Sequence, residues 1–172
     1  MASDSAPPQQ VTLLKRVTLD YSPDEDRIKL TGSTQEGVLV VAWLSLRLLG
    51  RVVPHLLTRY ESIATSAVSN AAPLQQPSQS EVSGGEEPVV SAHDTPSFLV
   101  GAADISQGTD AIVLTLRGGL DEVRFAIPAP KMASWLSGLK NLYQRAEWPM
   151  TIWQDADKIL VSSVGGGSVT LH

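Results

Sequence analysis

The sequence predicts an α+β fold of two antiparallel β-β-β-α units that are joined by a disordered linker. In each half of the chain, three strand-like stretches are followed by one amphipathic helix. Between the halves, residues 69–97 are rich in Pro, Ser and Gln and have no sustained periodicity, which is typical of a flexible linker. We therefore expect an internal duplication with pseudo-two-fold symmetry, in which the helices cover the sheet faces.

Three stretches of the first half have the composition of β-strands. Residues 11–21 are rich in β-branched side chains and alternate in part between apolar and polar. Residues 26–31 alternate apolar and basic side chains, which predicts a strand with one buried face. Residues 38–44 are apolar on both faces, so we expect a central strand that is covered on each side.

A long helix is predicted to follow the third strand. Ser45 suits the N-cap position, and apolar side chains then recur at helical spacing as far as Ala67. Pro54 interrupts this pattern, because its ring crowds the carbonyl of Gly50 and it has no N–H to donate. We expect one kinked helix, and the alternative is a break into two short helices near Val53.

The second half repeats this order of elements. Residues 98–106, 111–116 and 122–127 are predicted strands, with turn residues between them. Pro130 suits the first turn of a helix. The apolar stripe of this predicted helix consists of Met132, Trp135, Leu136, Leu139, Tyr143 and Ala146.

The boundaries of the units follow from these elements. Residues 151–153 and 159–164 are predicted to add edge strands to the second unit. A unit of about 55 residues buries too little surface to be stable alone, so we expect the two units to share a core. The predicted divisions are a disordered N-terminus (1–10), the first unit (11–68), the acidic linker (69–97), the second unit (98–164) and a loose C-terminus (165–172).

Matching residues in the two halves support the duplication. Asp20 and Leu30 lie 84 positions before Asp104 and Leu114. The same spacing relates other polar and apolar residues of the two predicted hairpins, which indicates one repeated unit. Short β sequences also produce such alternation by coincidence, and this is the alternative interpretation.

The composition is that of a globular protein. Hydrophobic residues make up 42% of the chain and charged residues 18%, which is too apolar for a fully disordered chain. The sequence contains no Cys, so disulfides and thiolate metal sites are excluded. Much of the net charge of −5 lies in the linker, which contains four acidic residues and no basic one. Bulk charge therefore neither favours nor opposes nucleic-acid binding.

The start of the chain predicts a cytoplasmic protein. Residues 1–10 contain no basic segment followed by an apolar run, so no signal peptide is expected. The most apolar stretch, residues 38–57, is interrupted by Arg47 and Arg51. Because a membrane span needs about 20 consecutive apolar residues, we expect this stretch to lie in a protein core and expect no membrane partner.

Basic side chains form a stripe on the first predicted helix. Arg47, Arg51, His55 and Arg59 recur every four residues, so they follow one slanted line opposite the apolar face. The stripe suits an acidic partner or a phosphate, and it would also suit docking of the acidic linker. The alternative interpretation is an ordinary solvated helix face.

Two of the four tryptophans are candidates for exposed anchors. Trp148 and Trp153 flank the end of the second predicted helix, where they could contact a partner or cover the edge of a sheet. Trp43 and Trp135 lie on elements with a core pattern, and we expect them to contribute to packing.

No motif of the sequence indicates catalysis. The three histidines are far apart along the chain, and the sequence has no nucleophile elbow, zinc-protease motif or dinucleotide-binding fingerprint. Three acidic residues, Asp24, Glu25 and Asp26, crowd one turn without the spacing of a calcium loop, so we expect a solvated turn. We therefore predict no catalytic, cofactor-binding or metal-binding residue and no enzymatic activity.

The leading functional hypothesis is a non-enzymatic accessory, adaptor or assembly factor that binds another protein, with a homodimer as a further expectation. The layout of duplicated meander-plus-helix units resembles that of single-strand nucleic-acid binders of the Whirly and PUR-repeat kind, which have four strands per repeat. This resemblance implies an alternative function, the binding of single-stranded nucleic acid on a sheet face. The basic residues of this alternative are Lys15, Arg16, Arg27, Lys29, Arg117 and Arg124.

Overall fold

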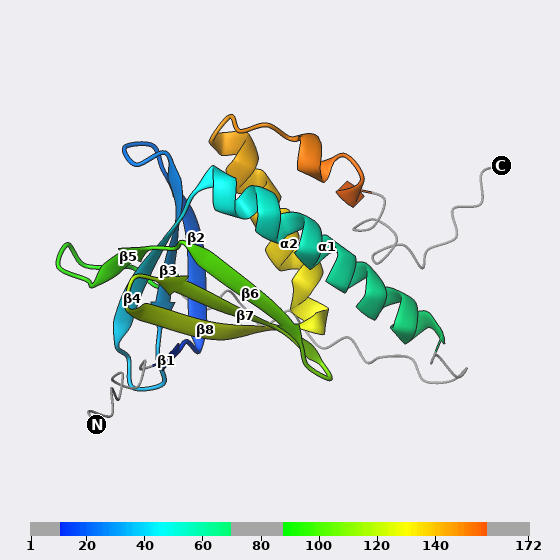
Figure 1. Ribbon diagram of the computed structural model, residues 1–172, viewed down its shortest axis with the longest axis horizontal. Helices are drawn as coiled ribbons and strands as arrows, with labels where there is room; N and C mark the ends of the chain where they lie inside the picture. The colour runs from blue at the N-terminus through cyan, green and yellow to red at the C-terminus, as the bar shows by residue number, and fades with distance from the viewer. Residues whose placement is uncertain (1–10, 70–87, 158–172) are drawn as a thin grey trace, which may run out of the picture.

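The computed structural model describes residues 11–69 and 88–157 (Figure 1). Within these residues it contains two four-stranded β-sheets and two α-helices, so the predicted α+β class is confirmed. The strand order is β2-β3-β4-β5 in one sheet and β1-β8-β7-β6 in the other. The strands are β1 (Val11–Leu13), β2 (Arg16–Ser22), β3 (Arg27–Ser33), β4 (Leu39–Leu44), β5 (Ser97–Leu99), β6 (Ala102–Gln107), β7 (Ala111–Gly118) and β8 (Asp121–Pro128).

Each half of the chain forms one antiparallel meander in its own sheet. It also contributes one short strand to the sheet of the other half. The meanders are β2-β3-β4 and β6-β7-β8. β1 pairs in parallel with β8, and β5 pairs in parallel with β4. Each sheet therefore contains, at one edge, a short strand from the other half of the chain.

The prediction of three strands per half is wrong, because both first strands divide in two. In the first half the break comes after the buried side chain of Leu14. The N–H of Leu14 donates to the carbonyl of Arg124 in one sheet, while the N–H of Lys15 donates to the carbonyl of Ser33 in the other. The chain thus changes sheets between two consecutive residues.

The second half has the same kind of break. The N–H of Val100 donates to the carbonyl of Trp43, and the N–H of Gly101 donates to the carbonyl of Arg117. The backbone is extended on both sides of each break, so sequence periodicity alone cannot reveal the change of partner.

The strand ladders do not keep a constant spacing of 84 residues between the halves. Asp20 pairs with Lys29, whereas Asp104, 84 positions later, pairs with Thr115, 86 positions after Lys29. The two hairpins are therefore shifted by two residues relative to each other. An even shift leaves each side chain on the same face of its sheet.

The end of the described chain differs from the prediction. Residues 151–153, which were predicted to form an edge strand, form the 3₁₀ helix η1 (Thr151–Trp153). The predicted strand at residues 159–164 and the predicted C-terminus at residues 165–172 lie outside the described residues. The predicted N-terminus at residues 1–10 and most of the predicted linker, residues 70–87, also lie outside them.

The first helix, α1 (Leu46–Ser69), is continuous through Pro54. The hydroxyl of Ser45 accepts a hydrogen bond from the N–H of Leu48 at 3.3 Å, as expected of an N-cap. The predicted single helix is therefore confirmed, and the break near Val53 is wrong. The second helix, α2 (Ala129–Arg145), begins directly after Pro128. Neither helix of the described chain is both long and apolar enough to cross a membrane.

Substitution of Gly50 by Ala is expected to stabilise the protein by about 0.5–1 kcal/mol, because Ala has a higher helix propensity. Gly50 lies inside α1, and an added Cβ would meet no atom within 4 Å. Urea denaturation would measure the free energy of unfolding. A loss of stability would instead show that the backbone at residue 50, whose carbonyl is crowded by the ring of Pro54, adopts a conformation that Gly tolerates better than Ala.

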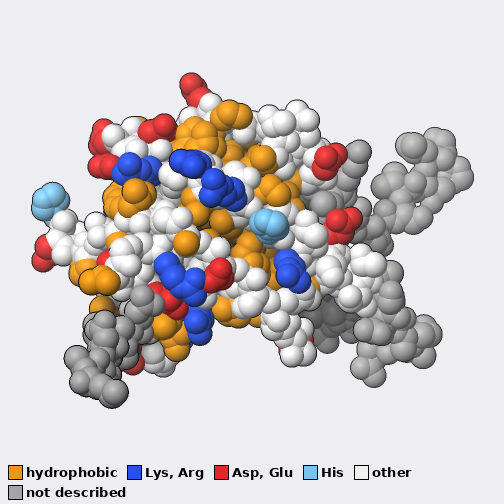
Figure 2. Space-filling view, in the orientation of Figure 1, with side chains coloured by type: hydrophobic (Ala, Val, Ile, Leu, Met, Phe, Trp, Pro, Cys, Tyr) orange, Lys and Arg blue, Asp and Glu red, His pale blue; other side chains and the backbone are white. Residues whose placement is uncertain are grey.

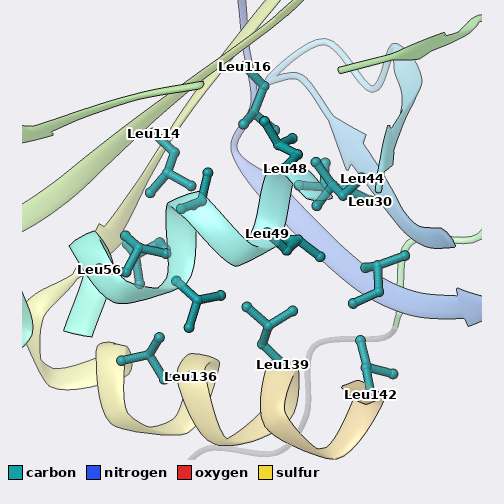
Figure 3. Close-up of a cluster of buried hydrophobic side chains, with 14 of the residues drawn as sticks. Leu30, Leu44, Leu48, Leu49, Leu56, Leu114, Leu116, Leu136, Leu139 and Leu142 are labelled. Atoms are coloured by element: carbon teal, nitrogen blue, oxygen red, sulfur yellow. The ribbon is translucent and has the colours of Figure 1, made fainter. Parts of the chain in front are cut away.

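Both halves contribute to a single hydrophobic core, which confirms the expectation of a shared core. The helices contact each other and lie beside the sheets (Figure 1). Figure 3 shows leucines of both sheets directed toward leucines of both helices. The labelled side chains are Leu30 on β3, Leu44 on β4, Leu114 and Leu116 on β7, Leu48, Leu49 and Leu56 on α1, and Leu136, Leu139 and Leu142 on α2.

Candidate functional site

The basic stripe of α1 lies on the surface of the protein. Arg47, Arg51, His55 and Arg59 are all exposed, while the opposite side of the helix is buried in the core. In Figure 2, basic and histidine side chains follow α1 across the face toward the viewer. The predicted stripe is thus brought together as one surface by a single rigid element.

The stripe has no carboxylate partner within the described residues. The ion pairs within the described residues all involve cations outside the stripe. Glu61 is the single acidic residue of α1. The stripe therefore presents uncompensated positive charge to the solvent. The paired cations are Arg27, Arg117, Arg124, Lys140 and Arg145.

A groove runs beside the stripe, between α1 and the edge strand β6. Its volume is about 280 Å³, and Arg51 and His55 form part of its wall. The strand side of the groove belongs to β6, which has β7 as its one neighbouring strand within the described chain. The remaining lining residues are Leu48, Val52, Gly101, Ala102, Ala103 and Ile105.

A second groove lies between the other helix and the other edge strand, α2 and β2. Its volume is about 360 Å³, and its wall includes Trp135 from α2 and Thr18 from β2. Pro88 also lines this groove, and the N–H of Val89 donates to the hydroxyl of Thr18 at 2.9 Å. A segment of the chain itself therefore reaches this second groove.

Trp148 and Trp153 are not exposed anchors, so that part of the partner-binding prediction is corrected. Their exposed fractions are 6% and 1%. Trp148 packs edge-on against Tyr21 and Tyr143, with ring centroids 5.9 and 5.2 Å apart, and Trp153 packs edge-on against Tyr143. The aromatic rings thus attach the C-terminal end of α2 to strand β2.

Tyr143 is the centre of this aromatic cluster. Its hydroxyl is buried and has no hydrogen-bond partner among the described residues, and burial raises its pKa above the usual value. The phenol is therefore neutral at physiological pH. The indole N–H of Trp153 is also buried without a partner in this part of the chain.

Asp26 holds the aromatic cluster to the turn between β2 and β3, a role that the sequence does not predict. Its carboxylate accepts hydrogen bonds from the indole N–H of Trp148 and from the hydroxyl of Tyr21, both at 2.9 Å. These two donors lower the pKa of Asp26, with the Trp148 contact the larger cause. No group of residues in the described chain is arranged to hold a metal ion, and this acidic turn is no exception.

Substitution of Asp26 by Asn is expected to reduce the loss of stability in acid. A carboxyl whose pKa is lowered by folding stabilises the protein above its unfolded pKa of about 3.9, and this contribution is lost as the pH falls through the folded pKa. Asn can adopt the left-handed φ of 47° at this position, so the substitution adds no backbone strain. Urea denaturation between pH 6 and pH 2 should therefore show a flatter pH dependence for the variant than for the wild type.

The contrary outcome is parallel curves for the two proteins. Parallel curves would mean that Asp26 has the same pKa in the folded and unfolded states. Glu36, whose pKa is also lowered, is present in both proteins and so cancels in the comparison.

The cations proposed for nucleic-acid binding are mostly engaged by the protein itself. Arg117 and Arg124 both contact Glu122, and Arg117 also contacts Asp104. The two carboxylates raise the pKa of Arg117 above its usual value. Arg27 pairs with Glu25.

The other three residues of that set lie on or beside the sheet that contains β3. The ammonium of Lys29 is 5.9 Å from the centroid of the Trp43 ring on the neighbouring strand. Lys15 is exposed and Arg16 is half-buried. The six cations are therefore divided between two sheets and do not form one row.

The basic stripe and the groove beside it, which also has aliphatic side chains in its lining, lie next to each other on the described surface. No family model, curated protein or solved structure matches the chain.

Proposed function

We propose that the protein is a non-enzymatic accessory, adaptor or assembly factor that binds another protein through the outer face of α1. The observation that carries this proposal is the basic stripe, whose four side chains are exposed and without a carboxylate partner among the described residues. The core side of α1 explains why the helix is amphipathic, but it does not require basic residues at every fourth position. An acidic surface on a partner would complement this charge.

Capture of partners from a lysate of the native host tests the proposal. We expect the stripe variant to recover at least about tenfold less partner than the wild type, because it opposes an acidic surface with negative charge. A sheet variant with the same change of charge should recover partners normally. The stripe variant carries Arg47→Glu, Arg51→Glu and Arg59→Glu, and the sheet variant carries Lys15→Glu, Arg27→Glu and Lys29→Glu.

Equal recovery of the same proteins by the wild type and the stripe variant would contradict the proposal, and the stripe would then be only a solvated helix face. Recovery of an untagged copy of this chain by a tagged copy would identify the predicted homodimer. Circular dichroism of both variants provides the control for folding.

The alternative proposal is a single-stranded nucleic-acid-binding protein that uses a sheet face. Four strands and a helix in each half favour it, because this is the number of strands in the Whirly and PUR-repeat layout. The ion pairs of Arg27, Arg117 and Arg124 disfavour it, since paired cations gain less from contact with phosphate. Fluorescence anisotropy with labelled single-stranded DNA at low salt distinguishes the two proposals, and absence of binding would reject this one.

We further propose that the halves arose by duplication and are related by a pseudo-two-fold axis. Three features support this proposal: the repeated order of four strands and a helix, the reciprocal parallel pairs β1·β8 and β5·β4, and the grooves at α1·β6 and α2·β2. Separate expression of residues 11–68 and 88–157 provides a test. Mixing the two purified halves should restore a folded complex, whereas folding of either half alone would argue against a shared duplicated core.

A further inference from the structure

The groove between α1 and β6 has the features of a peptide-binding site. One wall is an edge strand, whose outward backbone N–H and C=O groups have no partner strand among the described residues. The floor and the opposite wall contain apolar side chains from both elements, among them Val52 and Ile105. An extended peptide can place alternate side chains into such a groove while its backbone follows the strand.

The charge at the groove indicates what kind of peptide fits. Arg51 and His55 line the groove, and Arg47 and Arg59 continue the same line of α1 beyond it. The nearest carboxylate on β6 is that of Asp104, which is already paired with Arg117. Acidic side chains of a peptide would therefore find cations along α1 that have no competing carboxylate in the described chain.

In the other groove, a segment of the chain itself lies beside the edge strand. In the groove between α2 and β2, Pro88 contributes to the wall and Val89 hydrogen-bonds to Thr18 on the edge strand. The groove at α1 and β6 is built from the same kinds of element, an edge strand and a helix that contacts it. No described segment of the chain lies in it in the same way.

We infer that the groove between α1 and β6 binds an extended acidic segment of a partner protein, with alternate apolar side chains in the groove and carboxylates on Arg47, Arg51 and Arg59. This inference rests on the proposed protein-binding function and names the class of partner. The lining combines the aliphatic side chains of Val52 and Ile105 with the cation of Arg51, which favours a peptide with both apolar and acidic side chains over a nucleic-acid backbone, which has no apolar side chain.

Fluorescence anisotropy with the full-length chain tests this inference. The probe is a labelled peptide of alternating Glu and Val about ten residues long, enough to extend past both ends of β6, measured at about 50 mM salt. We expect saturable binding, and we expect the same peptide with Gln in place of Glu to bind at least about tenfold more weakly.

A matched pair of variants on β6 locates the site. Ala102 and Ser106 are both exposed on this strand and, being four residues apart, they point to the same side, but only Ala102 lines the groove. Ala102→Glu should weaken binding of the Glu–Val peptide about tenfold, whereas Ser106→Glu should change it by less than about twofold. Arg51→Glu should also weaken it about tenfold.

Three results would overturn the inference. The first is no saturable binding of the Glu–Val peptide, and the second is an equal effect of Ala102→Glu and Ser106→Glu. The third is a gain in affinity of about tenfold when Glu81, Glu86 and Glu87 of the chain are changed to Gln, because this would identify the chain's own linker as the occupant. If the peptide does not bind while the stripe variant still loses its partner in the lysate, the protein-binding proposal stands and only the extended-peptide inference fails.

Discussion

Gly118→Ala is expected to lower the free energy of unfolding by about 3 kcal/mol or more, because the new methyl group has no room. A Cβ at this position would lie 2.0 Å from the carbonyl oxygen of Leu99 and 2.6 Å from a ring carbon of Phe98. Both residues belong to β5, the short strand that crosses to the sheet of the first half. The closest of these atoms, the Leu99 carbonyl oxygen, belongs to the backbone, which cannot move aside as a flexible side chain can.

Two other glycines provide graded controls for Gly118→Ala in urea denaturation. A Cβ at Gly32 would meet only the side chain of Leu14, at 2.4 Å, so Gly32→Ala should cost less, about 1–2 kcal/mol. Gly50→Ala should stabilise the protein, since its Cβ meets open space. If Gly118→Ala were as stable as the wild type, β5 could not lie against the end of β7 as described.

Trp148→Ala is expected to destabilise the protein by about 3–5 kcal/mol, the usual cost of removing a buried Trp side chain. The indole ring is packed between Tyr21 and Tyr143, and its N–H donates to the carboxylate of Asp26. Its loss would leave a cavity and remove the connection between the end of α2 and strand β2. Trp148→Phe keeps part of the ring packing and should cost less.

Trp43 provides the control for Trp148, because it is only half-buried on β4. Trp43→Ala should cost clearly less than Trp148→Ala in the same urea denaturation. An exposed anchor would behave in the opposite way, with little change in stability and a loss of partner binding. That outcome for Trp148→Ala would support an exposed anchor at Trp148 and contradict its buried position.

Local patterns predicted the helices and most strands, because burial on one face leaves a clear period in the sequence. The stripe from Met132 to Tyr143 and the N-cap at Ser45 are examples, and both are confirmed. The alternation of residues 26–31 likewise predicted β3. In each case the signal comes from neighbours in the same element.

The exchanged strands could not be predicted, because pairing between distant strands leaves no local signal. Residues on either side of Leu14 and of Val100 remain extended while their hydrogen-bond partners change sheets. A strand that changes sheets can pack closely against a glycine of another strand, as β5 packs against Gly118. From one sequence, this glycine cannot be distinguished from a glycine of an ordinary turn.

The candidate site was predicted in part. The line of basic residues on α1 follows from helical geometry, so Arg47, Arg51, His55 and Arg59 could be placed on one surface from the sequence. The groove beside them depends on the position of β6, whose first residue, Ala102, lies 51 residues after Arg51. Asp26 looked like part of a solvated acidic turn, since its hydrogen bond to Trp148 spans 122 residues of the chain.

Site-specific photo-crosslinking tests most directly whether the outer face of α1 binds another protein. A photo-reactive benzoylphenylalanine would replace His55 in the stripe or, as a control, Lys131, which is exposed on α2. After irradiation in the native host, the proposal predicts a discrete adduct of higher mass from position 55 and none from position 131. No adduct from position 55, or the same adduct from both positions, would contradict it.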